Sequence, residues 1–192
     1  MKRLPIVSVG EGVGSDVCLS CGLCCDGAIH EYVTIGMGEV PHVRSLGLDV
    51  TIVETEARFL QPCTLFRESR CSVYGNRPVT CRKYVCKLLK KVVAGNLSKD
   101  AAIRIVEQAR ILSAAVQAAL PAGKTAAEVS DQIGKEWSSG EGMFGSLEGR
   151  TRHADLFLSA AVFVAFLKKN FHDEKATVPK KDSRAAGEEH KI

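Results

Sequence analysis

The stretch CLSCGLCC, residues 18–25, holds four cysteines in eight positions, and the last two are neighbours in the chain. At 100° per residue, a helix through this stretch would carry all four thiols within an arc of about 120°. Thiolates bind soft or borderline metals such as zinc, copper(I) and iron–sulfur clusters. Aliphatic side chains would fill an apolar face equally well without the risk of oxidation, so we interpret the stretch as metal-binding rather than as cysteine-lined packing.

Four further cysteines follow after a gap of 37 residues, with the spacing C-x7-C-x9-C-x4-C. Structural zinc sites usually contain two C-x2–4-C pairs, and only the first group has that spacing. Its C-x2-C-x2-C element is similar to the core of bacterial ferredoxin motifs, in which a remaining ligand comes from elsewhere in the chain. The spacing leaves zinc and an iron–sulfur cluster both open. The candidate metal ligands are Cys18, Cys21, Cys24, Cys25, Cys63, Cys71, Cys81 and Cys86.

The adjacent pair Cys24 and Cys25 is a constraint on any such site. Side chains of neighbouring residues diverge, so we do not expect both thiols to bind one tetrahedral ion. One of them would turn to a second centre or stay free as a reactive thiol. Eight thiols are two sets of four, which fits two metal centres or one centre with a redox-active set.

Composition and length indicate a soluble globular chain of 192 residues, with 45% hydrophobic and 25% charged residues. The first apolar run is too short for a secretory signal, and the apolar stretch Ala154–Leu167 has 14 residues, fewer than a membrane span needs. We therefore expect no membrane partner and a cytoplasmic protein. Thiols stay reduced in the cytosol, which favours metal ligation over a disulfide framework.

The basic residues are unevenly distributed. The net charge is +4, yet residues 69–99 contain eight Lys or Arg and no acidic residue. A metal centre with four thiolates carries a charge of about −2, so one or two centres would supply the missing counter-charge. A solvated basic face is the alternative, and the mild net charge gives no reason to expect a nucleic-acid partner.

The two cysteine groups together resemble a known family. CLSCGLCC and the later PCTLFRESRCSVYGNRPVTCRKYVC, residues 62–86, are similar to the CxxCxxCC family of zinc- or iron-chelating cysteine-cluster proteins of the YkgJ type. The resemblance covers about residues 18–90 and implies metal chelation. It also implies cofactor-binding roles for Tyr74, which would cover the site against water, and for Arg77 and Arg82, which would donate to cluster sulfurs or pair with carboxylates.

The expected fold is mainly α: a metal-organised cysteine-cluster lobe with irregular loops, packed against C-terminal helices. We predict a flexible N-terminal arm (1–14), a cysteine-cluster region (15–95), a helical region (96–172) and a disordered tail (173–192). The cysteine region should contain a strand at 32–35 and a short helix near 40–47, whereas 51–60 fits strand or helix. A further helix would begin after Pro78 and run through residues 79–91.

Three C-terminal helices are predicted from periodicity and capping signals. The first follows an N-cap at Ser98 and stops at Pro121, and the second begins with a capping box of Thr125 and Glu128 and runs to about Trp137. The third, residues 151–172, is almost entirely apolar and should be the most buried.

Three functions are compatible with these patterns. The first is a metal-binding protein that holds an iron–sulfur cluster or zinc. The second is an enzyme that uses the centre for redox chemistry or for modifying a protein, for example by methyl transfer, although no S-adenosylmethionine loop is recognisable. The third is a basic module that binds nucleic acid. We favour the first function. It is compatible with a protein partner that binds to the C-terminal helices.

Overall fold

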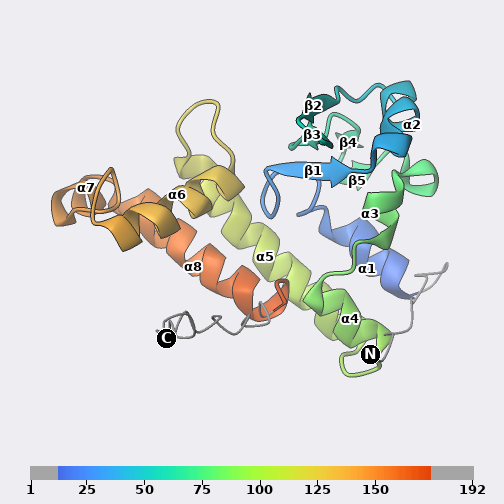
Figure 1. Cartoon of the computed structure of the whole chain (residues 1–192). Coiled ribbons are helices and arrows are strands. Elements are labelled where there is room, and N and C mark those ends of the chain that lie inside the picture. The colour runs from blue at the N-terminus through green and yellow to red at the C-terminus, as the bar shows by residue number, and fades with distance from the viewer. Residues whose placement is uncertain (1–12, 174–192) are drawn as a thin grey trace, which may run out of the picture.

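A long helix, α5, separates a small β-sheet with short helices from a group of C-terminal helices (Figure 1). The computed structural model describes residues 13–173, and the fold is mainly α, as predicted. The predicted arm and tail lie outside the described residues, except for residues 13, 14 and 173. The helices are α1 (Val13–Cys21), α2 (Val40–Ser45), α3 (Val79–Lys83), α4 (Lys87–Val93), α5 (Lys99–Ala119), α6 (Ala126–Ser139), α7 (Leu147–Arg152) and α8 (Ala154–Asn170).

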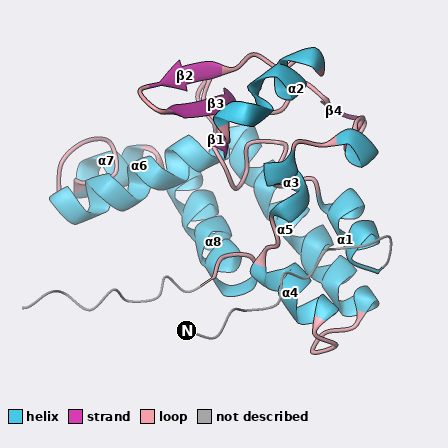
Figure 2. Ribbon diagram, turned by 45° about the vertical axis from the view of Figure 1, so that its right-hand side comes forward, coloured by secondary structure: helices cyan, strands magenta, loops and turns pink. Residues whose placement is uncertain are grey.

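The larger sheet is antiparallel with strand order β1-β3-β2, formed by Tyr32–Ile35, Glu56–Leu60 and Thr51–Val53 respectively. β1 pairs with β3 from Tyr32↔Leu60 to Ile35↔Ala57. The prediction of a strand at 32–35 is confirmed, and the undecided segment 51–60 forms β2 and β3. Alternation along β3 buries Ala57 and Phe59 under α2, and this makes a small core of its own (Figure 2).

A second, two-stranded sheet carries one of the cysteines. β4 (Phe66–Arg67) pairs with β5 (Arg70–Cys71), and the connecting residues Glu68 and Ser69 both have positive φ, 50° and 61°. Two consecutive residues with positive φ are typical of a type I′ hairpin turn, whose twist matches that of the strands. The Ser69 hydroxyl accepts a hydrogen bond of 3.0 Å from Arg110 of α5, so the hairpin is fastened to the long helix.

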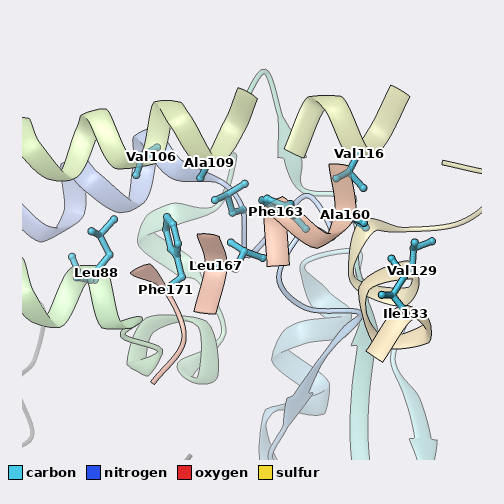
Figure 3. Close-up of a cluster of buried hydrophobic side chains, with 14 of the residues drawn as sticks. Leu88, Val106, Ala109, Val116, Val129, Ile133, Ala160, Phe163, Leu167 and Phe171 are labelled. Atoms are coloured by element: carbon cyan, nitrogen blue, oxygen red, sulfur yellow. The ribbon is translucent and has the colours of Figure 1, made fainter. Parts of the chain in front are cut away.

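The main core lies between α5, α8, α6 and α4 (Figure 3). α5 presents small or branched side chains, including Ala109 and Val116, to α8, where Phe163 is fully buried. Complete burial of a side chain of this size contributes about 1.5–3 kcal/mol. The same core includes Val17 and Leu23 from the N-terminal part of the chain, so it contains residues from both sides of the predicted domain border at residue 95. That border stays a prediction.

The first two C-terminal helices begin as their capping signals predict. The Ser98 hydroxyl accepts from the backbone N–H of Ala101, and α5 ends before Pro121. At α6, Thr125 and Glu128 each bond the other's backbone N–H, which is a complete capping box. Both predictions are confirmed.

The third predicted helix is divided. α7 covers Leu147–Arg152, α8 begins at Ala154, and His153 between them has φ −116° and ψ 35°. Arg150 of α7 donates to the carbonyls of Phe144 and Gly145, which folds α7 back onto the glycine-rich loop and prevents one straight helix. α8 buries one face, while Leu158 on the other is 60% exposed. Within residues 13–173, every helix is too short or too polar to cross a bilayer.

Two helix predictions inside the cysteine region are wrong. The helix through residues 18–25 ends at Cys21 because Gly22 adopts φ +73°, and its carbonyl then accepts from the N–H groups of Cys25 and Asp26 in a tight turn. The helix through residues 79–91 is interrupted, because Tyr84 is extended and Cys86 starts a new helix as its N-cap. Pro78 does precede the first helical residue, as predicted.

Candidate metal centre

All eight cysteines line one cavity of about 350 Å³. Each is half-buried and none is in a disulfide. The remaining wall is largely apolar and includes Leu48, Phe59, Leu65, Phe66, Leu88 and Phe171. The structure therefore brings together every cysteine that the sequence nominates, although they span 69 positions (Cys18 to Cys86, counted inclusively). The thiols surround the cavity: within residues 13–173, no three Cys, His, Asp or Glu side chains converge on a single ion-sized point.

Each cysteine is positioned by a different local feature. Cys18 and Cys21 lie one turn apart on α1, and Cys24 and Cys25 lie in the turn that Gly22 opens. The others come from the turn after β3, from β5, from α3 and from the N-cap of α4; they are Cys63, Cys71, Cys81 and Cys86. Secondary structure alone thus places the ligand candidates on six separate segments around the cavity.

The first group of thiols consists of Cys18, Cys21, Cys24 and Cys86. Burial raises the pKa of each, and Cys86 adds to the rise for the other three. The pKa of Cys21 reaches about 12. Helix α1 packs against α4, and Cys18, Cys21 and Cys86 all contact the main core. Cys86 Sγ accepts a hydrogen bond of 3.5 Å from the N–H of Leu89.

The second group consists of Cys25, Cys63, Cys71 and Cys81. Burial raises the pKa of Cys25 to about 12, and the next contributions come from the other three members. The pKa of Cys81 rises to about 11, through burial and then through Cys63 and Cys71. The backbone fixes part of this group: the carbonyl of Cys25 accepts from the N–H of Cys63 at 2.8 Å, and Cys63 and Cys81 contact the smaller core under α2.

The raised pKa values mean that Cys21, Cys25 and Cys81 are protonated near neutral pH in the metal-free chain. Bringing several thiolates together in an apolar cavity costs free energy both through desolvation and through mutual repulsion. A bound cation reverses that balance, because a metal deprotonates its coordinating thiols outright. The cavity is therefore unfavourable for free thiolates and favourable for thiolates that share a metal.

Arg77 lines the same cavity as the eight cysteines. Its charge opposes the effect of burial and lowers the pKa of both Cys18 in the first group and Cys81 in the second. The guanidinium carbon is 3.4 Å from the centroid of the Tyr74 ring, and Nε donates to the Tyr74 carbonyl at 2.7 Å. Tyr74 lines the cavity as well. Arg82, by contrast, is exposed and is not part of the cavity wall.

Several residues at the site have contacts that the sequence does not predict. His30 and Tyr84 line the cavity and meet edge to face, with ring centroids 5.0 Å apart. Glu39, forty residues before α3, accepts from the N–H of Val79 at 2.6 Å and so positions the helix that bears Cys81. Arg110 donates to the Ser20 carbonyl at the end of α1 and to Ser69 in the β4–β5 turn. Only the three-dimensional fold reveals these partners, because each contact joins segments at least 40 residues apart.

The donor chemistry fits a thiophilic metal centre. Sulfur ligands select zinc, copper(I) and iron–sulfur clusters over magnesium or calcium, and eight sulfurs surround this cavity. Gln61 is a further buried group in the wall, and its Oε1 has no hydrogen-bond partner.

A comparison with family models matches the part of the chain that contains all eight cysteines. Residues 17–105 match CxxCxxCC, described as “Putative zinc- or iron-chelating domain”. This part of the chain is similar to the CxxCxxCC family, and the resemblance drawn from the cysteine motifs is confirmed over these residues. Searches of curated proteins and of solved structures return no match. The match supports metal binding by this region with zinc and iron both open, as the sequence predicts.

Proposed function

We propose that the chain is a metal-binding protein whose eight cysteines hold iron–sulfur chemistry, with zinc as the alternative metal. The observation that carries this proposal is the single cavity of about 350 Å³ that all eight thiols line. A lone ion occupies a point, whereas a polynuclear cluster fills a volume and takes its ligands from around its surface. The C-x2-C-x2-C element with a remote fourth cysteine also has the spacing of ferredoxin-type ligation.

The cysteines would hold the centre and Arg77 would offset part of its negative charge. The charge of Arg77 lowers the pKa of Cys18 and of Cys81, both of which line the cavity. This effect supports the role that the family resemblance implies for Arg77. Tyr74 would cover the site on the side where its hydroxyl donates to the Ser15 carbonyl at 3.5 Å. When bound, an iron–sulfur cluster supplies one-electron redox capacity and zinc supplies structural cross-linking.

The basic stretch is partly used within the chain, which favours metal binding over a nucleic-acid module. Lys90 pairs with Asp173, and Lys99 pairs with Asp16 of α1. Arg77 stacks on Tyr74 beside the cavity. We also propose a cytoplasmic protein, since eight free thiols suit a reducing compartment. A protein partner would meet the C-terminal helices at exposed apolar residues such as Leu158 and Val162.

Anaerobic purification with elemental analysis and visible absorption tests the proposal. A brown protein with iron and acid-labile sulfide supports it, whereas a colourless protein with stoichiometric zinc selects the alternative metal. A protein that takes up neither metal contradicts both. Cys21→Ser should lower the metal content, and Ser20→Ala, one position away and exposed, is the matched control that should retain it.

A further inference from the structure

We propose that the eight cysteines form two separate four-thiolate metal centres, one built by the first group and the other by the second. This inference rests on the proposed function and adds to it the number of centres and the ligands of each. It answers the question that the adjacent pair Cys24 and Cys25 raises, because it assigns the two neighbours to different centres.

The neighbours of each thiol agree with this division. The cysteines that contribute most to the pKa of Cys18 and Cys21 all belong to the first group. The cysteines that contribute most to the pKa of Cys25, Cys63 and Cys81 all belong to the second group. One contribution crosses the groups: Cys25 raises the pKa of its covalent neighbour Cys24. These effects agree with the division but do not carry it, because the packing and the backbone contacts assign the thiols.

Packing gives the same division independently. Members of the first group contact the main core between the helices, whereas members of the second contact the smaller core under α2. The second group is also linked through the backbone, from Cys25 to Cys63 by one hydrogen bond, from Cys63 to Phe66 by another, and from Phe66 to Cys71 by strand pairing. Packing thus separates Cys18, Cys21 and Cys86 from Cys63 and Cys81, and the backbone contacts add Cys25 and Cys71 to the second set. Cys24 remains as the fourth thiol of the first group.

The turn after α1 explains how neighbouring residues reach different units. Leu23 is fully buried in the main core, which anchors the turn, and Cys25 N and Asp26 N both bond to the Gly22 carbonyl. Successive side chains in such a turn leave the backbone in different directions. Cys25 is held at the turn that carries Cys63, because its carbonyl accepts from the N–H of Cys63, whereas Cys24 directly follows Leu23 of the main core.

Charge supports two centres with a shared counter-ion. Two clusters, each with four thiolates, would carry about −4 in total, and repulsion between them across a small cavity would be unfavourable without a cation. Arg77 is the cation that acts on members of both groups. One guanidinium at the shared cavity would offset charge on both centres.

The adjacent cysteines provide the sharpest test, because Cys24→Ser and Cys25→Ser are matched variants one position apart. Iron, sulfide and zinc per chain are measured after anaerobic reconstitution, with circular dichroism and gel filtration as checks on folding. We expect each single variant to lose about half of the metal. Cys24→Ser combined with Cys86→Ser should lose no more than Cys24→Ser alone, whereas Cys24→Ser combined with Cys25→Ser should lose nearly all of it. If that cross-group pair loses no more than either single variant, the division is wrong.

Native mass spectrometry of the unmodified chain gives a second reading that no folding defect can obscure. During loading we expect a species with one centre and then a species with two. Direct conversion from the metal-free chain to a single loaded species overturns the two-centre inference and leaves the proposed function intact. A chain that never gains metal overturns the proposed function itself.

Discussion

Replacement of Gly22 by alanine should destabilise the protein through a specific collision with Phe66. Gly22 ends α1 with φ +73°, a conformation that alanine adopts only at a cost of about 1–2 kcal/mol. A Cβ at this position would lie 2.4 Å from Cζ and 2.8 Å from Cε2 of the Phe66 ring. Forcing a methyl group into packed surroundings costs a further amount of about 1–3 kcal/mol. The expected loss of stability is the sum, about 2–5 kcal/mol.

Gly95→Ala is the matched control. Gly95 has nearly the same φ, +74°, but nothing lies within 4 Å of the position that its Cβ would take. This variant should therefore lose only the backbone contribution of about 1–2 kcal/mol. Urea denaturation of the metal-free variants measures both losses, provided that the m-values are equal. Equal destabilisation by the two substitutions, within about 0.5 kcal/mol, would refute the contact with Phe66.

The same substitution should also affect the metal. Phe66 begins β4, which pairs with the strand that bears Cys71, so displacement of the ring moves a member of the second group. Gly22→Ala should therefore reduce metal content while Gly95→Ala retains it. Truncation of Phe66 to alanine in the Gly22→Ala background should recover part of both losses, and absence of any recovery would show that the ring is not the cause.

Three further predictions concern the core, the charge and the pH. Phe163→Ala should cost about 3–5 kcal/mol of unfolding free energy in urea denaturation, because the ring is fully buried between α5 and α8. Arg77→Met should make metal release by acid occur at higher pH, since the guanidinium favours the thiolate form; Arg82→Met, at an exposed position outside the cavity, is its control. The metal-free protein should lose stability in thermal melts as pH rises, because burial raises the pKa of Cys21 and Cys25 to about 12 and a raised folded-state pKa favours the protonated, folded form below it.

Each of these has a contradicting result. A loss below about 1 kcal/mol for Phe163→Ala would mean that the helices repack without it. Identical acid-release curves for the two arginine variants would remove Arg77 from the site. Constant melting temperature of the metal-free chain from neutral pH to pH values near the raised thiol pKa would mean that the thiols are not buried in the folded state. In the loaded protein the pH dependence should have the opposite sign, because protons displace metal as pH falls.

The sequence predicted those helices and strands whose start or type depends on residues within the same segment. Ser98 and the Thr125–Glu128 pair place the starts of α5 and α6, because a cap acts on backbone groups three residues away. The β-branched residues of β1 and the glycine after α2 likewise indicate their elements from within the segment. The predicted identity of the cysteine-cluster region follows from the motif spacing, and the family match confirms it.

The sequence could not give the parts that depend on distant contacts. The sequence of residues 79–91 predicts one continuous helix because it contains no sign of a distant contact. In the structure, the N–H of Lys87 donates to the carbonyl of Phe171, and this bond anchors the start of α4 beside the end of α8. The interruption there separates Cys81 from Cys86 and allows them to face different groups.

X-ray absorption spectroscopy of the protein, purified and loaded without oxygen, tests the central claim most directly. If the cavity thiols hold the metal, the absorber at the iron or zinc edge has a first shell of sulfur only, with metal–sulfur distances of about 2.3 Å. Substitution of Cys24 and Cys25 together by serine should abolish that shell. A first shell dominated by nitrogen or oxygen in the unmodified protein would contradict the assignment of the eight cysteines as metal ligands.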